Sequence, residues 1–555
     1  IIAADTPVAA AQMDERHGTV IVAGQRQWLR QIAALPLTPV APPHDRADYA
    51  LRLRKDLRPI ATIALQKAGD GGWFVFLPPA RAAYRLTDPG GTLARLLASP
   101  AAPLLPWDEV PVVVSEADKN DAVKNAFSAL RDERVDYSAV IPYRMRRLRL
   151  AAERFFSETH GHEEAHQDFA AFCAEAQSWL DDYALFMALD QQYGGEGKLW
   201  QDWPAALALR DPDALQEAAQ TLAGECDFWK FCQWCFDRQW RVIKQYANER
   251  GIRIIGDMPI FVSAHSADVW MHQALFDLGA DGRPRVIAGV PPDYFSATGQ
   301  RWGNPLYRWN IHAQNGYRWW IARIRRVLSL CDGVRIDHFR GFESYWEIPA
   351  DAEMAVHGHW QPGPGLALFD AIRQAGLFDE MNSADGGTPK IFAEDLGILT
   401  PEVVALRRTV GLPGMRILQF AFDGQSDNLY LPHNFTPDTV VYTGTHDNDT
   451  SLGWWNALGT HQQDDVRRYL DTDGSAIHWA LIRAAAASVA TISIVPMQDV
   501  LGLDTHSRMN RPGQSHGNWE WRFQWRQVEP WHAGRLAELA HLYGRHPDAP
   551  QPAFA

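Results

Sequence analysis

The stretch GVRIDHFRG, Gly333–Gly341, joins a buried strand to a cluster of charges. Its first part, GVRI, is an apolar run of strand length that ends at Asp337. Residues two apart on a strand point to the same side, so Arg335 and Asp337 are predicted to be in contact. The guanidinium is expected to keep the carboxylate ionised at neutral pH. A charge held in this way at the end of a buried strand indicates a functional site.

Six apolar runs with strand character, this one included, alternate with helical stretches after Gly251. Such alternation is typical of a parallel sheet with helices outside it. Four of the six strands run into a carboxylate within a residue or two of their carboxyl end, as expected for the active face of a (β/α)8 TIM-type barrel. The rival α/β fold is a doubly wound open sheet, but no glycine-rich nucleotide fingerprint supports it. The runs are IRIIGD (252–257), GVRID (333–337), KIFAED (390–395), MRILQFAF (415–422), TVVYTGTHD (439–447) and TISIVPMQD (491–499).

The chain of 555 residues is too long for one ordinary core, and its pattern changes along the sequence. Residues 1–115 contain short β-like runs, among them GWFVFLPP and VPVVV, between Pro/Ala-rich spacers. We expect a small N-terminal β-rich domain there. Residues 116–250 show helical spacing and are predicted to form helical insertions attached to the barrel. The barrel itself is assigned to 251–535, and 536–555 to a C-terminal tail.

Composition excludes several classes of function. The formal net charge of −14 argues against a nucleic-acid partner, which usually requires a basic surface. No apolar run reaches 18 residues and no signal-peptide pattern opens the chain, so no membrane partner is expected. Five sparse cysteines suit reduced thiols in a cytoplasm. The 23 tryptophans suit either a Trp-rich core or the flat platforms on which sugar rings stack.

Two motifs imitate metal sites. HEEAH, His162–His166, has the zinc-protease spacing, but its polar flanks lack the apolar face of a metal-binding helix. A solvated polar turn is the better interpretation. Cys232 and Cys235 have C-x-x-C spacing, but no second pair and no βαβ pattern accompany them. They are interpreted as buried structural cysteines, and no metal is expected.

Four carboxylates stand at predicted strand ends: Asp257, Asp337, Glu394 and Asp447. Each one alone could be a helix N-cap. Together on one barrel face they would repel one another, which a fold tolerates only where cations, shared protons or function compensate. Glu394 follows an apolar strand, so desolvation is expected to raise its pKa, as suits a general acid. His446 adds a donor. This set fits retaining glycosyl transfer, which needs one nucleophilic and one proton-donating carboxylate.

Long blocks of this sequence resemble the amylomaltases, also called disproportionating enzymes or 4-α-glucanotransferases, of the α-amylase-like barrel group. The resemblance covers about Val135 to Arg522 and is most specific in PPDYFSATGQRWGNP and GTHDNDT. The other matching blocks are GDMPIFVSAHSADVW from Gly256, GVRIDHFRGFESYWEIPA from Gly333, IFAEDLGILTP from Ile391, GMRILQFAFDG from Gly414, IVPMQDVLGL from Ile494 and GNWEWR from Gly517.

The resemblance implies a role for each matching residue. Asp337 of RIDHF corresponds to the nucleophile, Glu394 of AEDLG to the acid/base and Asp447 of GTHDN to the transition-state stabiliser. The implied reaction moves α-1,4-glucan segments between maltooligosaccharides or starch-like glucans, with no cofactor and no metal. Further glucan contacts are implied at Asp257, Asp293, Gln300, Trp302, Asn304, Arg335, His446 and Asn518.

The chain also departs from the family pattern. The N-W-G-I-G-D-F-like and S-P-Y-x-P-x-S-R-like motifs of the family are not found, so the first two barrel strands are not identifiable. GWFVFLPP or VPVVV could replace them, though no motif supports either. Two other functions therefore stay open: an α-glucan hydrolase with the same triad, and an impaired, non-catalytic glucan-binding relative.

Overall fold

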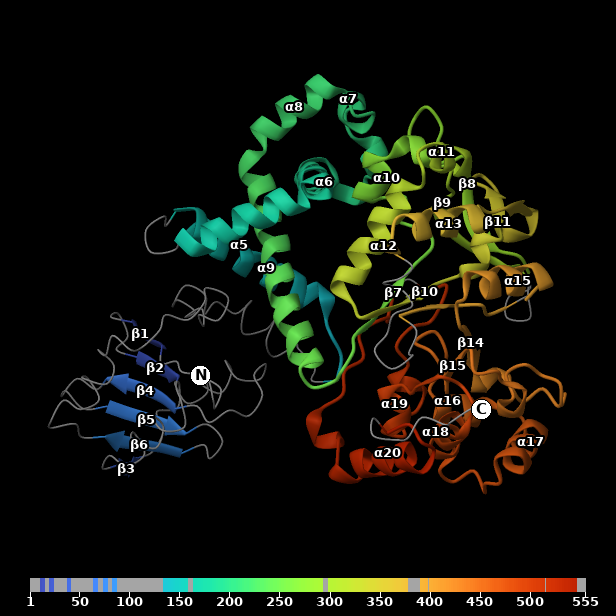
Figure 1. The fold of residues 1–555 in the computed structure, drawn as a ribbon. Coiled ribbons are helices and arrows are strands. Elements are labelled where there is room, and N and C mark those ends of the chain that lie inside the picture. The colour runs from blue at the N-terminus through green and yellow to red at the C-terminus, as the bar shows by residue number, and fades with distance from the viewer. Residues whose placement is uncertain are drawn as a thin grey trace. The chain divides into compact units, whose positions relative to one another are not determined.

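The computed structural model describes six strands within residues 10–86 and then the ranges 133–157, 163–292, 298–377, 390–397, 399–514 and 516–546 (Figure 1). The chain divides into two compact units, Ile1–Val123 and Lys124–Ala555. The division falls after residue 123, and the change of sequence pattern predicted a boundary at residue 115.

The first unit contains an antiparallel sheet of six short strands in the order β1-β2-β4-β5-β6-β3. The WFVFL part of GWFVFLPP forms β5, which pairs with β4 on one side and β6 on the other. Both edges of β5 are therefore occupied within this sheet, and it does not act as a barrel strand. VPVVV lies outside the described residues. The strands are β1 (Ala10–Asp14), β2 (Thr19–Ala23), β3 (Leu37–Val40), β4 (Ile63–Lys67), β5 (Trp73–Leu77) and β6 (Ala82–Leu86).

A group of helices opens the second unit. Residue Asp211 caps α8 by accepting a hydrogen bond from Ala214 N, and Pro212 supplies a first turn that needs no donor. α6 and α9 pack side by side with α5 around an aromatic cluster that includes Phe155, Phe231 and Trp234. The helices are α5 (Tyr137–Ser157), α6 (Glu163–Tyr193), α7 (Ala205–Ala208), α8 (Pro212–Thr221) and α9 (Ala223–Asn248).

The six predicted apolar runs form two parallel three-stranded sheets, β7-β10-β13 and β14-β15-β16. The sheets adjoin where Ala393 N donates to Pro413 O at 2.9 Å. All six strands share one direction, and together they form one wall of parallel strands. Their carboxyl ends therefore lie at the same end of this wall. The strands are β7 (Ile255–Met258), β10 (Gly333–Ile336), β13 (Ile391–Ala393), β14 (Gly414–Ile417), β15 (Thr439–Tyr442) and β16 (Ile492–Ile494).

The wall has two edges among the strands described. β7 pairs only with β10, and β16 pairs only with β15. Every residue of β10 and β13 is buried, whereas Ile255 of β7 is 43% exposed and all of β16 is half-buried. Eight barrel strands were expected, and the described part of the chain supplies six parallel ones.

A second, antiparallel sheet, in the order β12-β11-β8-β9, is inserted around β10 in sequence. It consists of β8 (Val286–Val290), β9 (Gln300–Pro305), β11 (Ser344–Pro349) and β12 (His359–Pro362). The remaining helices include α12 (Arg318–Leu330), α13 (Leu366–Gln374), α15 (Pro401–Val410), α16 (Ser451–Ala457), α17 (Thr460–Leu470) and α18 (Ile477–Ala487).

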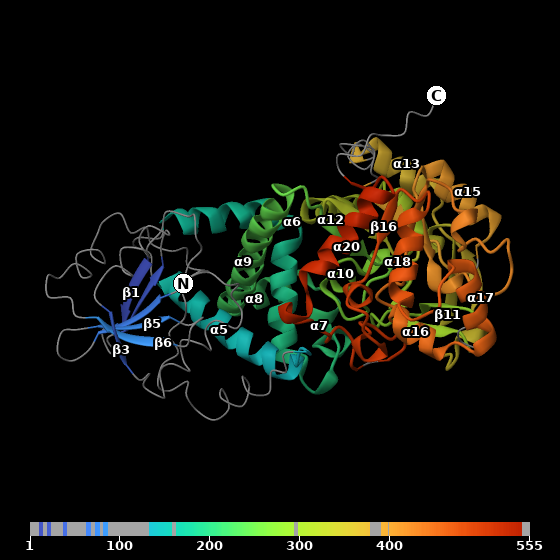
Figure 2. The same cartoon turned by 90° about the horizontal axis from the view of Figure 1, so that it is seen from below.

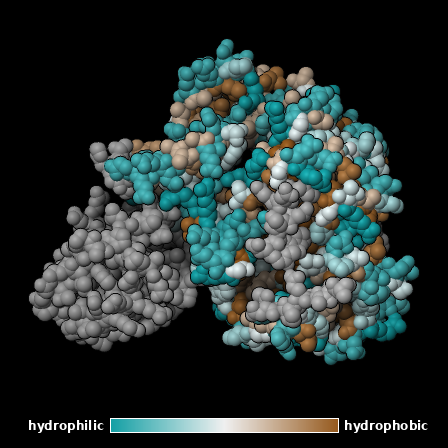
Figure 3. Space-filling view, viewed as in Figure 1, coloured by the Kyte–Doolittle hydropathy of each residue, from teal (hydrophilic) through white to brown (hydrophobic). Residues whose placement is uncertain are grey.

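The chain closes with α19 (Met497–Val500) and α20 (Pro530–Leu542). Figure 2 shows α20 beside α18, where Leu539 is buried in a small apolar cluster. The predicted boundary at residue 535 therefore falls inside a packed helix. On the face seen in Figure 3, hydrophilic residues cover much of the described surface and apolar ones show between them. None of the helices described is both long and apolar enough to cross a membrane.

Candidate active site

A buried arginine links the ends of two neighbouring strands. β10 pairs with β7 so that Arg335 lies opposite Asp257. Its Nε and Nη2 atoms donate to Asp257 Oδ2 at 3.0 and 2.8 Å, and Nη2 also donates to Asp337 Oδ1 at 2.7 Å. The predicted contact between Arg335 and Asp337 is thus confirmed. One guanidinium compensates two carboxylates that would otherwise repel each other.

The pKa of Asp337 differs from the expectation. Burial among the walls of the site raises the pKa of Asp337, and this outweighs the lowering by Arg335. The nearby charges of Asp257 and Asp447 raise it further, while His446 lowers it. The expected effect of Arg335 is present, but desolvation is the larger cause. The Asp337 side chain is 38% exposed, so a ligand has access to it.

Glu394 follows β13 and is buried. Its Oε2 accepts a hydrogen bond from His338 N at 2.8 Å, and its Oε1 accepts one from Leu396 N at 2.7 Å. His338 has a positive φ of 48°, and this left-handed turn directly after Asp337 brings its N–H to Glu394. Burial and the charge of Asp337 raise the pKa of Glu394 to about 7. The predicted upward shift is confirmed, and a carboxyl with this pKa can both give and take a proton at neutral pH.

Asp447 lies in the loop after β15. Its Oδ1 accepts a hydrogen bond from Asn510 Nδ2 at 2.6 Å, and its Oδ2 lies 3.4 Å from His446 Nε2. Arg508 Nη2 donates to the main-chain oxygen of Asp447. Sequence reasoning missed Arg508 and Asn510, because SRMNRPG is preceded by no strand pattern. Its one signal is a run of polar side chains beside a Pro-Gly turn.

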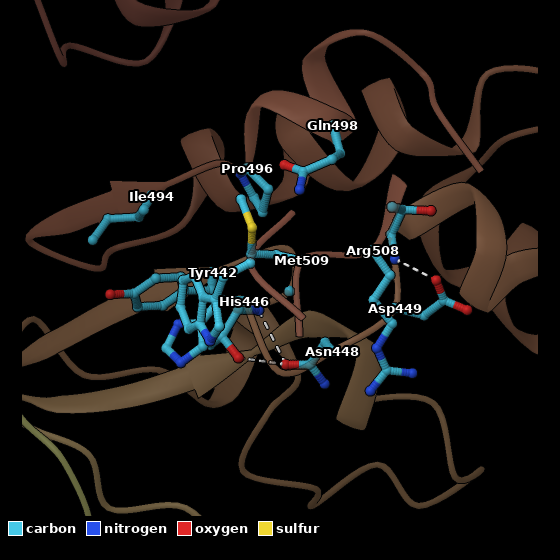
Figure 4. A pocket seen from close by; sticks show the side chains of 13 residues that line it. Tyr442, His446, Asn448, Asp449, Ile494, Pro496, Gln498, Arg508 and Met509 are labelled. Atoms are coloured by element: carbon cyan, nitrogen blue, oxygen red, sulfur yellow. Dashed lines mark hydrogen bonds between the residues drawn. The ribbon is translucent and has the colours of Figure 1, made fainter. Parts of the chain in front are cut away.

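A cavity of about 240 Å³ lies beside His446 (Figure 4). The His446 ring lies against the indole of Trp519, with ring centroids 5.1 Å apart. Trp519 is 50% exposed and has a positive φ of 61°, which is a strained conformation for a bulky residue. The residues that line the cavity are Tyr442, Gly444, Thr445, His446, Asn448, Asp449, Thr450, Ile494, Pro496, Gln498, Arg508, Met509 and Trp519.

Three predicted glucan contacts lie on β9. Trp302 packs edge-to-face against His338, the residue after Asp337, with centroids 4.9 Å apart. Its indole N–H donates to Gln300 Oε1 at 3.2 Å. Asn304 instead donates its amide to Val262 O at 2.9 Å. Trp302 and Gln300 are therefore brought to the site, whereas the Asn304 amide holds a neighbouring loop.

Asn518, a further predicted contact, lies in the loop next to Trp519. Asn518 folds its own loop: its oxygen accepts from Arg511 N at 2.9 Å and its amide donates to Gln514 O at 2.8 Å. Its side chain is thus engaged with the main chain. Asp293 lies outside the described residues.

Two buried aspartates, Asp395 and Asp499, hold the chain segments that follow the strands in place through hydrogen bonds. Asp395 directly follows Glu394, is 1% exposed and accepts from Met415 N at 2.7 Å, which ties β13 to β14. Arg407 Nε lies 3.2 Å from its other oxygen. Asp499 accepts from Ser451 N at 2.7 Å and from the Thr443 hydroxyl at 2.5 Å. Burial raises the pKa of both aspartates. Their effect is to hold the loops from which Glu394 and Asp447 project.

The motifs that imitate metal sites have other surroundings. His162 lies outside the described residues, and His166 stacks on Phe155 with centroids 4.2 Å apart. Cys232 and Cys235, predicted to be buried, are partly buried in the aromatic helix cluster. Burial raises the pKa of Cys232 to about 12. Within the described ranges no three His, Cys, Asp or Glu side chains gather as a metal would require.

Comparison with known proteins agrees with this geometry. A family model described as 4-alpha-glucanotransferase matches residues 103–527. The chain is 48% identical to a 4-alpha-glucanotransferase of Thermus thermophilus over 420 residues, which cover 74% of this chain and 81% of the relative. It is 45% identical to a Synechocystis enzyme of the same description over 415 residues, 74% and 80% of the two chains.

A solved structure has a similar fold and sequence. The amylomaltase from Streptococcus agalactiae in complex with acarbose superposes with a TM-score of 0.69 at 37% identity, over 74% of this chain and 80% of that one. The amylomaltase from Corynebacterium glutamicum, at 19% identity and a TM-score of 0.57, shows the shared fold alone. With more than half of its length matched by the family model, the chain belongs to the 4-alpha-glucanotransferase (amylomaltase) family, whose α-amylase-like barrel it shares.

Proposed function

We propose that this chain transfers α-1,4-glucan segments between maltooligosaccharides or starch-like glucans by a retaining double displacement. One observation carries the proposal: an accessible carboxylate and a buried, protonatable one follow adjacent parallel strands. The register pairs Ile336 with Ala393, so Asp337 and Glu394 are the next residue on each strand. Neighbouring strands lie about 4.8 Å apart, close to the about 5–5.5 Å between the carboxyls of retaining enzymes.

In the first step, Asp337 Oδ attacks the anomeric carbon of the donor sugar. The bond from that carbon to the glycosidic oxygen breaks, and Glu394 gives its proton to the leaving oxygen. The donor segment is then held as an ester of Asp337, and Glu394 is ionised. Because its pKa is about 7, the Glu394 carboxyl can supply this proton at neutral pH.

In the second step, ionised Glu394 takes the proton of the 4-hydroxyl of a second glucan. That oxygen attacks the anomeric carbon, the ester bond breaks and Asp337 returns as a carboxylate. Asp447 stabilises the positive charge that develops on the sugar ring in both steps. Arg335 and His446 adjust the charge of Asp337, since both lower its pKa.

Aromatic surfaces support transfer to a sugar over transfer to water. The exposed Trp302 lies against His338 and the exposed Trp519 against His446. Each offers an apolar face on which the C–H side of a glucose ring can stack. An acceptor sugar stacked there would displace water from the ester. We place the reaction in the cytoplasm, where sparse cysteines suit reduced thiols.

The test is the Asp337→Asn variant, with Asp370→Asn as its matched control. Asp370 forms an exposed ion pair with Arg373 on α13. We expect Asp337→Asn to lower turnover of maltotriose by about 10⁴-fold or more while glucan binding survives. Asp370→Asn should leave turnover unchanged. Near-normal turnover in Asp337→Asn would exclude it as the nucleophile.

The products of the unmodified enzyme distinguish the two reactions. A transferase converts maltotriose into glucose and a ladder of longer glucans, whereas a hydrolase yields short sugars alone. A chain that binds maltoheptaose yet leaves it intact under all conditions would contradict both enzyme functions.

A further inference from the structure

We propose that Asn510, held in place by Arg508, is a positioning residue for Asp447 and determines which carboxylate oxygen faces the glucan. The inference rests on the proposed function, because it assigns a partner to the proposed transition-state stabiliser. It concerns a loop of residues 508–510 that no strand or helix pattern marked out in the sequence.

Asn510 contacts the Asp447 loop through both its side chain and its main chain. Its Nδ2 atom donates to Asp447 Oδ1 at 2.6 Å, and its backbone N donates to His446 O at 3.0 Å. Hydrogen bonds to an ionised acceptor are stronger than neutral ones. Two contacts on consecutive residues fix the orientation of the Asp447 side chain as well as its position.

Arg508 supports this contact from the cavity wall. Its Nε atom donates to Asn510 O at 2.8 Å, and its Nη2 atom donates to the main-chain oxygen of Asp447. One rigid guanidinium therefore spans the two residues whose side chains meet. Burial lowers the pKa of Arg508, but a guanidinium stays charged at any working pH.

The consequence for Asp447 is an asymmetry between its oxygens. Oδ1 is occupied by the Asn510 amide, while Oδ2 lies 3.4 Å from His446 Nε2. The Asp447 side chain is 42% exposed, so Oδ2 is left to face a bound sugar. A carboxylate that stabilises a developing charge must be aimed before the reaction begins, since reorganisation would raise the barrier.

A stability experiment tests the contact without any substrate. The Asn510 amide lies 2.6 Å from the Asp447 carboxylate, so Asn510→Asp brings two carboxylates into contact there. At this distance the two cannot both stay ionised. We expect its Tm to fall below that of the unmodified protein as the pH rises from 4 to 8. The exchanged pair Asn510→Asp/Asp447→Asn restores one amide and one carboxylate, so its Tm should return.

Asn434→Asp is the matched control for stability. The Asn434 amide donates to Ser426 O and Asn428 O, both at 2.9 Å, and among the described residues it forms no hydrogen bond with a carboxylate. Its loss of Tm should not be repaired by Asp447→Asn. If Asn510→Asp shows no pH-dependent loss, or the exchange repairs nothing, the contact is not made and the proposal fails.

An activity experiment separates positioning from a merely structural role. Asn510→Asp places a second carboxyl in hydrogen-bonding contact with that of Asp447, and such a pair holds a shared proton to higher pH, so the acidic limb of the kcat–pH profile should move up by about one pH unit or more. Asn510→Ala keeps that limb in place but should lower kcat by about 10- to 100-fold, with little change in KM. The exchanged pair should fold and yet be inactive, because its carboxylate stands on the wrong residue.

Arg508→Met is compared with Arg545→Met. Arg545 also donates to main-chain oxygens, those of Ala486, Ser488 and Ala490, none of which belongs to the Asp447 loop. Only Arg508→Met should lower kcat, by about tenfold. An active enzyme whose acidic limb does not move in Asn510→Asp overturns the positioning role alone. Inactivity of the unmodified protein overturns the proposed function, and the positioning role with it.

Discussion

The inner strands β10, β13, β14 and β15 and the edge strands β7 and β16 belong to one wall but have different surroundings. The inner strands have neighbours on both sides and are almost wholly buried, whereas each edge strand pairs on one side only among the strands that the structure describes. The three proposed catalytic carboxylates all follow inner strands, and Asp257 stands on an edge strand. Burial in the inner part raises the pKa of Asp337 and Glu394. The chemistry is thus concentrated where the wall is most completely packed.

The largest effect should come from removing a core side chain on an inner strand. Ile391 and Ile255 are the first residues of β13 and β7, on either side of β10, and are 2% and 43% exposed. Ile391→Ala should lower the free energy of unfolding by about 2–5 kcal/mol, because it leaves a cavity. Ile255→Ala should cost less than about 1 kcal/mol. Chemical unfolding followed by tryptophan fluorescence measures both, and equal losses would contradict the distinction between inner and edge strands.

The next largest loss of stability should come from removing Arg335, which links an edge strand to an inner strand. Arg335→Met leaves Asp257 of the edge strand and Asp337 of the inner one without their shared cation. We expect a loss of about 2 kcal/mol at pH 7, below the value for a fully buried pair because both carboxylates are partly exposed. The loss should shrink at acidic pH, where the carboxylates protonate.

Arg373→Met is the control for Arg335→Met, since its partner Asp370 is exposed. It should change stability by less than about 1 kcal/mol at any pH. A deficit in Arg335→Met that is the same at pH 4 and pH 7 would show that lost packing, rather than charge, is responsible.

The pH dependence of activity tests the burial of the inner site directly. Glu394 must be protonated to release the leaving glucan, and its pKa is about 7. The value of kcat/KM for maltotriose should therefore fall as the pH rises above about 7, approaching tenfold per unit. Because the folded-state pKa is raised from 4.5, the folded protein holds this proton more tightly than the unfolded chain. Stability should accordingly decline from pH 4.5 to about 7 and then level off.

Glu394→Gln is the matching variant for that profile. It should remove the decline in stability over this range, as well as most of the activity. A kcat/KM that stays constant up to pH 9 would contradict the assignment of Glu394 as the proton donor.

The smallest effect should come from the edge strand. Asp257 raises the pKa of Asp337, so Asp257→Asn should move the acidic limb of kcat/KM to lower pH, by less than about one unit. Asp332→Asn is the control, because Asp332 joins the same two strands at their opposite ends by accepting from Ile254 N at 2.8 Å. A limb that moves upward in Asp257→Asn, or moves equally in both variants, would show that the edge strand does not act through its charge.

Part of the site could be predicted from local sequence. The strand that ends at Asp337 has an apolar run and a two-residue spacing to Arg335, and both features are local. The raised pKa of Glu394 followed from the apolar strand before it. The pKa direction of Asp337 could not be predicted, because burial, Asp257 and Asp447 raise the pKa while Arg335 and His446 lower it, and these residues come from β7, β10 and the loop after β15. The engaged amides of Asn304 and Asn518 escaped prediction because their partners are main-chain atoms of folded loops.

The sequence by itself determined the six strands, their common direction, the three carboxylates at their ends and, through its long matching blocks, the family. Those features depend on apolar periodicity and on neighbours a few residues apart. The tertiary structure alone decided that Arg335 is shared between two strands and that Asn510 meets Asp447 from 63 residues away in the chain. It also decided which strands are edges. Pairing and burial are set by residues distant in sequence, so the charge and the aim of each carboxylate are properties of the folded wall.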